Sequence, residues 1–165
     1  RDYYLSAVEA HEYGLIDDAT LRPRPDYYAS LLHKRLVGQR VLKAQVADTD
    51  DGLLRAYAGC SRAGAAGGRS GPAPVVTLVN LDTEARAVRI PNLGSRIELY
   101  QVSARHALED DVYLNGSPLT AGDDGTPPRT GPAIVSFDSG DPWIELPALS
   151  YAFVVFPAGD VLACR

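Results

Sequence analysis

Apolar side chains recur at helical spacing in one early segment of the chain. Between residues 26 and 37 the large apolar residues lie three and four positions apart, at Tyr27, Tyr28, Leu31, Leu32 and Leu36. Pro23 and Pro25 disfavour helix before this segment, and Asp26 is a residue type that favours the N-cap position. Gly38 follows the last apolar position, where glycine commonly ends a helix. The pattern predicts a helix from Asp26 to Val37 that is stopped by Gly38.

After Gly38 the period of the pattern changes from helical spacing to two. Short runs rich in β-branched and aromatic residues follow one another, and Gly, Pro, Asn or Asp separates them. The nine runs span residues 40–48, 53–60, 74–81, 85–91, 95–103, 111–116, 133–138, 143–147 and 150–157. Many short strands at this spacing are typical of an antiparallel sandwich or barrel. We therefore expect a mainly β fold, most simply an antiparallel β-sandwich.

Two stretches rich in Gly and Pro interrupt the strands, at residues 64–74 and 120–132. Such composition is flexible, and both stretches lie between predicted strands, so we expect long loops rather than domain linkers. The change of period near Gly38 is a better candidate for a domain boundary than either of these stretches. The sequence thus divides into an αβ-type element at residues 1–38 and an all-β part at residues 39–165.

Composition narrows the classes of partner. The chain has 165 residues, a net charge of −5 and 45% hydrophobic residues, which suits a globular domain. A net negative charge argues against nucleic acid as a partner, because binding to phosphates needs a clustered positive field. No run of 18 apolar residues occurs, so no transmembrane segment is expected. The sequence begins at Arg1 and contains no Met, so we expect a fragment or a processed chain.

Catalytic groups are not recognisable in the pattern of acidic residues. The 21 Asp and Glu residues fall mostly in turn sequences, where solvated carboxylates are common. The segment DTDDG lacks the rest of a calcium loop, the Gly-rich stretch near residue 64 lacks the ending of a P-loop, and no G-x-S-x-G motif occurs. We therefore assign no catalytic residue, no metal site and no cofactor to this chain.

Two cysteines, Cys60 and Cys164, permit one disulfide or two buried thiols. The three histidines, His11, His33 and His106, match no zinc-ligand spacing. A bridge that closes a loop of this length could stabilise the fold by up to about 4–5 kcal/mol, and it would indicate a secretory compartment. From the residues alone both alternatives remain open.

Aromatic residues are candidates for a sugar-binding platform. They are Tyr13, Tyr27, Tyr28, Tyr57, Tyr100, Tyr113, Trp143 and Tyr151. Most occupy helix or strand positions that suit a core, and Tyr13, beside Gly14, is the one for which an exposed ring is expected. Asn115-Gly116-Ser117 is an N-glycosylation sequon, and its Asn-Gly pair is also a strong signal for a type I′ turn.

Several motifs resemble heparanase and heparanase-like proteins of glycoside hydrolase family 79. The segment Tyr13-Gly14-Leu15-Ile16-Asp17, the helix start Pro25-Asp26-Tyr27-Tyr28 and the helix end Leu36-Val37-Gly38 resemble the family's junction sequence. Near the C-terminus, Leu146-Pro147-Ala148-Leu149-Ser150-Tyr151-Ala152-Phe153 and Ala163-Cys164-Arg165 resemble the family's tail. The resemblance runs from about residue 10 to the end and is looser in the middle.

The resemblance implies a (β/α)₈ barrel followed by a β-sandwich that takes one strand from a segment before the barrel. Residues 1–38 would then be the last strand-helix unit of the barrel and residues 39–165 the sandwich. It also implies a Cys60–Cys164 disulfide and a substrate-cleft position for Tyr13 and Gly14, whereas glycosylation at Asn115 is expected from the sequon alone. His11 stands where the family usually has Gly, which departs from that pattern. Both catalytic glutamates would lie upstream of this chain.

The parent protein implied by the resemblance is a retaining β-glucuronidase that acts on a glucuronic-acid-containing glycan. Its catalytic barrel would be the partner of this chain, which alone would be inactive. Secretion to the extracellular matrix or cell wall, or delivery to a lysosome or vacuole, would follow, with association at a membrane surface also open. The alternative from a different class is a non-catalytic β-sandwich that binds glycans through surface aromatics or serves a structural or secretory role.

Overall fold

The computed structural model describes residues 12, 14–15, 22–47, 52–65, 71–105, 111–120, 128–138 and 141–165. A twelve-residue helix, α2 (Pro25–Leu36), precedes the strands. The strands are β1 (Val37–Leu42), β2 (Leu54–Ser61), β3 (Pro74–Asn80), β4 (Arg86–Arg89), β5 (Arg96–Ser103), β6 (Tyr113–Leu114), β7 (Ser117–Pro118), β8 (Ala133–Ser136), β9 (Trp143–Leu146) and β10 (Ser150–Val155), and a short 3₁₀ helix, η1 (Leu162–Cys164), follows them. The prediction of a mainly antiparallel β fold is confirmed.

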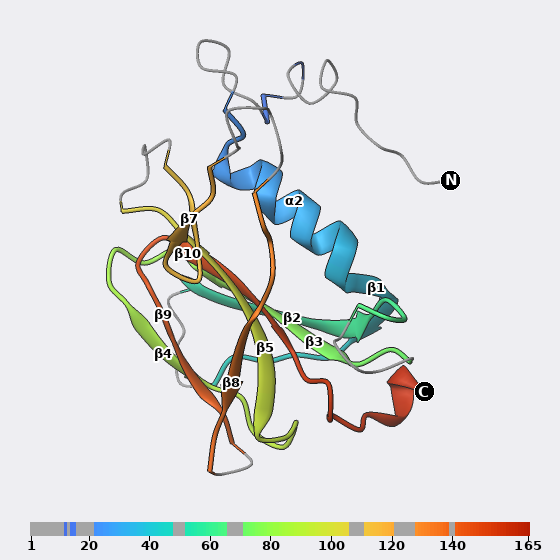
Figure 1. Cartoon of the computed structure of the whole chain (residues 1–165). Coiled ribbons are helices and arrows are strands. Elements are labelled where there is room, and N and C mark those ends of the chain that lie inside the picture. Colours follow the sequence, from blue (N-terminus) through green and yellow to red (C-terminus); the bar gives the residue numbers. More distant parts are fainter. Residues whose placement is uncertain are drawn as a thin grey trace.

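The strands form two sheets of unequal size. The larger sheet has the order β1-β2-β3-β10-β5-β6-β7, and β8 also pairs with β5. The smaller sheet consists of β4 and β9. All of these pairings are antiparallel. Figure 1 shows α2 lying against the larger sheet and the β4–β9 pair set apart from the helix. The molecule is therefore a helix, a large sheet and a small sheet stacked in that order.

Alternating side chains of β10 supply both cores. Phe153 and Val155 face α2, where they pack with Tyr28, Leu32 and Leu36 of the helix. The intervening residues Ala152 and Val154 face the small sheet, where they pack in a second cluster that contains Ile144 and Leu146 of β9. Successive side chains of a strand point to opposite faces, so a strand buried on both faces must be apolar throughout. This explains the continuous apolar run of residues 151–157.

The helix begins and ends differently from the prediction. Its first residue is Pro25 and its N-cap is Arg24, whose side chain makes no capping hydrogen bond. Asp26 therefore lies in the first turn rather than at the N-cap, because a proline at the first helical position needs no N–H partner. At the other end Val37 is already extended, with ψ of 127°, and starts β1.

Gly38 is required for close packing, not for a helix stop. It lies in β1, and a Cβ added there would stand 2.8 Å from the carbonyl oxygen of Cys60 and 3.0 Å from that of Ser61. The helix does end just before Gly38, as predicted, but Gly38 is an extended residue of β1 and not a left-handed glycine that caps the helix. The chain passes directly from helix to strand, and the pairing of Val37 with Ser61 brings two backbones too close for a side chain.

Each of the nine predicted strand runs overlaps a strand of the structure, although β1 begins three residues before its run and β7 lies outside all of the runs. β1 ends at Leu42, although the alternating pattern continues to residue 46, and among the described strands it pairs with β2 at the edge of the sheet. The pair β6 and β7 forms a hairpin in which Asn115 and Gly116 have φ of 50° and 78°. Positive φ at both positions is the geometry of a type I′ turn, so the turn prediction is confirmed.

We predict that Gly38→Ala destabilises the domain by about 1–3 kcal/mol, because the added methyl group would overlap two backbone carbonyl oxygens. Urea unfolding followed by circular dichroism measures the effect. Gly131→Ala is the matched control: its Cβ would meet nothing within 4 Å, so it should change the free energy of unfolding by less than about 0.5 kcal/mol. Equal effects of the two substitutions would show that the close approach is not a constraint.

Candidate docking groove and the C-terminal disulfide

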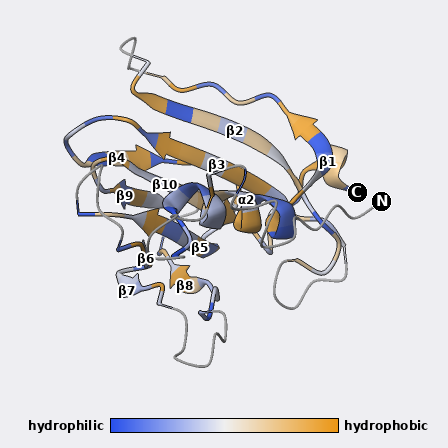
Figure 2. Ribbon diagram, turned by 90° about the horizontal axis from the view of Figure 1, so that it is seen from above, coloured by the Kyte–Doolittle hydropathy of each residue, from blue (hydrophilic) through white to orange (hydrophobic). Residues whose placement is uncertain are grey.

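An open apolar groove of about 890 Å³ lies between α2 and the larger sheet. The helix contributes Pro25, Ala29 and His33 to one wall. Its floor and second wall come from β1, β2, β3 and β10 through Val37, Val41, Tyr57, Ala58, Val75, Thr77, Val79, Tyr151 and Phe153. The groove exists because α2 packs mainly over β10 and β5, while Tyr57 of β2 and Val41 of β1 stay exposed beside it. Figure 2 looks onto this side, with α2 in front of the strands.

Two apolar side chains at the groove are strongly exposed. Tyr57 on β2 is 57% exposed, and Val41 on β1 is 87% exposed. An exposed patch of this kind usually marks an interaction surface, because leaving large apolar groups in water forgoes about 1.5–3 kcal/mol for each side chain that burial would gain. The sequence pattern did not indicate this groove, since it combines residues from the helix and from four strands.

Two tyrosines, the buried Tyr28 and the partly buried Tyr151, fix the helix that forms one wall of the groove. The hydroxyl of Tyr151 donates to the carbonyl oxygen of Pro25 at 2.7 Å, and that of Tyr28 donates to the carbonyl oxygen of Leu119 at 3.2 Å. Burial raises the pKa of both phenols, and for Tyr151 the nearby Asp26 carboxylate raises it further. Both phenols stay protonated at neutral pH and act as fixed hydrogen-bond donors. Tyr28 and Tyr151 are therefore structural residues and not part of a sugar platform.

The structure joins Cys60 of β2 and Cys164 of η1 by a disulfide, with 5.4 Å between the Cα atoms and a sequence separation of 104. Both residues are buried. Arg40 of β1 supports the same connection, because its Nη1 atom donates to the carbonyl oxygens of Ala163 at 2.8 Å and Arg165 at 2.7 Å. The C-terminal segment is thereby held against β1 and β2. This is the pairing that the family resemblance implied.

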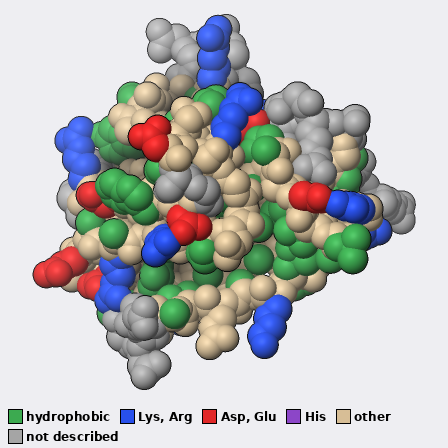
Figure 3. Space-filling view, turned by 90° about the horizontal axis from the view of Figure 1, so that it is seen from below, with side chains coloured by type: hydrophobic (Ala, Val, Ile, Leu, Met, Phe, Trp, Pro, Cys, Tyr) green, Lys and Arg blue, Asp and Glu red, His purple; other side chains and the backbone are tan. Residues whose placement is uncertain are grey.

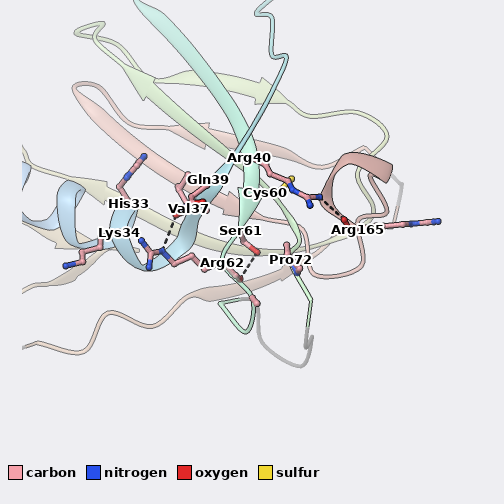
Figure 4. Close-up of a pocket in the computed structure, with 12 residues that line it drawn as sticks. His33, Lys34, Val37, Gln39, Arg40, Cys60, Ser61, Arg62, Pro72 and Arg165 are labelled. Atoms are coloured by element: carbon pink, nitrogen blue, oxygen red, sulfur yellow. Dashed lines mark hydrogen bonds between the residues drawn. The ribbon is translucent and has the colours of Figure 1, made fainter. Parts of the chain in front are cut away.

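A second cleft, of about 1060 Å³, adjoins the disulfide and contains Lys34, Arg40, Arg62 and Arg165. Figure 4 shows that Lys34 and Arg165 point away from one another. Arg40 and Arg62 donate to backbone carbonyl oxygens, and Arg165 pairs with Asp160. The pKa of Arg165 is raised by that hydrogen bond to Asp160. The cations of this cleft therefore do not converge on one anion-binding point.

The predicted substrate-binding residues lie before α2. Tyr13 and His11 both lie outside the described residues. Gly14 lies in a turn with φ of 70°, a conformation that glycine adopts readily, and Leu15 beside it accepts a hydrogen bond from the backbone N–H of Arg24 at 2.9 Å. The structure thus ties this turn to the start of the helix. A role for Tyr13 and Gly14 in substrate binding stays a prediction.

Asn115 contributes its side chain to the sheet edge. Its Oδ1 atom accepts from the backbone N–H of Gln101 at 2.9 Å, and its Nδ2 atom donates to the carbonyl oxygen of Leu99 at 3.0 Å. Nδ2 is the atom to which an N-linked glycan would be attached, so a glycan there would have to share this contact with β5. The side chain has a structural role, and glycosylation of Asn115 stays a prediction.

The acidic residues with defined contacts are mostly paired with arginine. Asp82 accepts from Arg86, Asp141 from Arg89 and Asp160 from Arg165. Hydrogen bonds from Arg86 and Arg89 hold the pKa values of Asp82 and Asp141 below the ordinary range. Figure 3 shows cationic and anionic side chains interspersed over the lower face. Within the described parts of the chain, no group of three His, Cys, Asp or Glu residues could hold a metal ion.

Comparison with known proteins identifies the relatives of this chain. No protein-family model matches the sequence. Heparanase of Gallus gallus is 34% identical over 94% of this chain and 30% of its own length. Heparanase of Mus musculus is 31% identical over 94% of this chain and 29% of its own length. The chain is similar to the C-terminal part of heparanase and heparanase-like proteins. It corresponds to a C-terminal part of these relatives and spans about 30% of their length.

Similarity to heparanase does not by itself imply activity, because the relatives include an inactive protein. Inactive heparanase-2 of Homo sapiens is 29% identical over 94% of this chain and 28% of its own length.

Two solved structures of glycoside hydrolases share the fold of this chain. CelM2, a bifunctional glucanase-xylanase from a metagenome library, superposes with a TM-score of 0.54 at 17% identity, over 84% of this chain and 24% of its own. The xylanase Xyn30A of Clostridium acetobutylicum superposes with a TM-score of 0.52 at 14% identity, over 87% and 30%.

We predict that removing the disulfide in a Cys60→Ala/Cys164→Ala variant destabilises the domain by about 4 kcal/mol, because the loop it closes is long. Urea unfolding measures the effect. Non-reducing mass spectrometry should also give a mass two hydrogens below that of the reduced chain. Two titratable thiols in the folded protein, or a midpoint that reductant does not change, would contradict the bridge.

Proposed function

We propose that this chain is the C-terminal accessory part of a heparanase-like glycoside hydrolase. Residues 1–38 are the end of its (β/α)₈ barrel, and residues 39–165 are the β-sandwich that supports the barrel. Both catalytic glutamates lie in the upstream part, so the chain alone does not hydrolyse glycans. The parent is a retaining β-glucuronidase that acts on a glucuronic-acid-containing glycan, and Tyr13 and Gly14 contribute to the rim of its substrate cleft.

The open groove beside α2 is the observation that carries this proposal. The chain corresponds to about 30% of its heparanase relatives, so about two thirds of a typical relative lies outside it. A face that exposes Tyr57 and Val41 beside a helix needs a partner, and the remainder of the same protein is the occupant available at high effective concentration. Burial of these two side chains would contribute several kcal/mol to docking.

The packing of α2 supports its place at the junction. The helix buries Tyr28, Leu32 and Leu36 against the large sheet, while Leu31 on another side of the helix is 39% exposed. A helix that belongs both to a barrel and to the sandwich interface needs apolar residues on more than one side. The sheet thus covers one face of α2, and we assign the exposed face to the barrel.

The disulfide supports an oxidising compartment, such as the extracellular space or a lysosome or vacuole. Among the helices of the described residues, none is long and apolar enough to cross a membrane. We therefore propose secretion or vesicular delivery of the parent protein.

We predict that Tyr57→Asp in a protein that joins this chain to its upstream barrel lowers hydrolysis of heparan sulfate at least about tenfold, because the charge would be buried at the docking groove. Activity per milligram of secreted protein is measured together with the yield. In the isolated chain the same substitution should change the midpoint of urea unfolding little, because Tyr57 is exposed there.

Ile134→Asp is the matched control for this experiment. Ile134 is also a strand residue, is 51% exposed and does not line the groove. Its substitution should leave activity near the starting value. Equal losses for the two variants would sink the docking role of the groove. Hydrolysis of heparan sulfate by the isolated chain would contradict the assignment of catalysis to the upstream part.

A further inference from the structure

Trp143 is an exposed aromatic residue on the side of the molecule away from the helix. It lies at the start of β9, it is 58% exposed, and it is the single Trp of the chain. The alternation of β9 buries Ile144 and Leu146 in the core shared with the large sheet and leaves Trp143 and Glu145 outside. On β4 the outward residues are Ala87 and Arg89. Trp143 is thus the large apolar side chain among these four outward residues.

Cross-strand neighbours give the indole a polar border and leave space beside it. Arg89 lies directly opposite Trp143, and Ala87 lies opposite Glu145. Neighbouring side chains on one face of an antiparallel pair lie within reach of each other, so the small side chain of Ala87 leaves room at the diagonal position. The surface therefore consists of one flat apolar ring with a guanidinium and a carboxylate beside it.

The charged groups at this surface are held in place. Arg89 forms an ion pair with Asp141, and Asp141 also accepts from the backbone N–H of Asn92 at 3.3 Å. The Arg89 guanidinium and then the Asn92 amide hold the pKa of Asp141 below its ordinary value, so the pair stays charged at neutral pH. A guanidinium has five donors, so Arg89 can bond to a further acceptor while it remains paired with Asp141.

The backbone that carries Trp143 is fixed on both sides of β9. One side pairs with β4 along the whole strand. On the other side, Nε2 of Gln101 in β5 donates to the carbonyl oxygen of Glu145 at 2.6 Å. The buried Asn80 donates to the carbonyl oxygens of Leu146 at 3.3 Å and Pro147 at 2.8 Å, which anchors the end of the strand. A ring on a rigid strand loses little entropy when it binds a ligand.

We propose that Trp143, with Arg89 beside it, is a contact site for a polysaccharide chain, separate from the groove beside α2. The C–H face of a pyranose ring stacks on the indole, and its hydroxyl or carboxylate groups meet Arg89. A protein interface is disfavoured here, since the core of such an interface needs several adjoining apolar side chains. The choice of a glycan as ligand rests on the proposed glycosidase function. The position of Trp143 beside Arg89, called the Trp143 platform below, follows from the pairing of β4 with β9.

The single tryptophan allows a direct test on the 165-residue chain. Titration with xylohexaose, a neutral probe, and with a heparan sulfate hexasaccharide, an anionic probe, is followed by tryptophan fluorescence. We expect a saturable shift of the emission to shorter wavelength with at least one probe, because stacking removes the indole from water. A response to xylohexaose alone identifies ring stacking as the main contact, and a stronger response to heparan sulfate adds the Arg89 contact. No response to either probe overturns the proposal.

Variants separate the platform from the groove. By isothermal titration, Trp143→Ala should weaken binding of the responding probe about tenfold, the size expected for the loss of one aromatic stacking contact, while Tyr57→Ala should not change it. Equal affinity of Trp143→Ala and the unchanged chain would overturn the proposal. Trp143→Ala should leave the unfolding midpoint nearly unchanged, since the ring is exposed.

A longer protein that includes the barrel distinguishes this inference from the proposed function. If its Trp143 emission is already that of a buried indole and is insensitive to acrylamide, the ring is covered by protein and the platform is refuted. Retained hydrolysis with no glycan response at Trp143 refutes the platform alone. Glycan binding at Trp143 without hydrolysis refutes the glycosidase proposal alone.

Discussion

The double-sided burial of β10 is the constraint on which the rest of the structure depends. This strand lies between β3 and β5 in the large sheet, and its side chains enter the helix-side core and the small-sheet core in alternation. A strand with both faces buried needs a layer on each face. The helix supplies one layer and the β4–β9 pair supplies the other. The groove lies where the helix layer ends, and the proposed Trp143 site lies on the outer face of the β4–β9 layer.

The two covering layers leave different surfaces behind. On the helix side, α2 is too narrow to cover the whole sheet. The part of the sheet beside it forms a groove in which apolar side chains from four strands meet. On the other side the small sheet exposes its own outer face, where Trp143 stands among charged and small residues. Extended apolar surface fits a protein partner, and an isolated ring with polar neighbours fits a sugar. The heparanase-like relationship gives both surfaces a place in one protein.

Local pattern was sufficient for the elements but not for their ends. The apolar spacing at Tyr28, Leu32 and Leu36 gave α2 to within one residue at each end, and period-two runs located the strands. The role of Gly38 was predicted wrongly, because the contact that requires glycine at this position is made with a distant part of the chain. It is a glycine since Cys60 and Ser61, more than twenty residues away, place carbonyl oxygens where a Cβ would stand. Likewise Asn80 falls in the predicted strand run 74–81, and nothing in the local pattern indicates that its buried amide holds the end of β9.

By itself the sequence determined the β class, the helix, the Asn115-Gly116 turn and, through its junction and tail motifs, the heparanase-like relationship. These depend on residues close together in the chain, where periodicity and turn chemistry act directly. Only the tertiary structure decided which aromatic residues are exposed. Tyr100 and Tyr57 both lie in the middle of predicted strands, yet the first is buried under α2 and the second lies open beside it. The physical reason is that exposure depends on how far a covering layer extends, and that extent is set by the packing of helix on sheet and not by either strand alone.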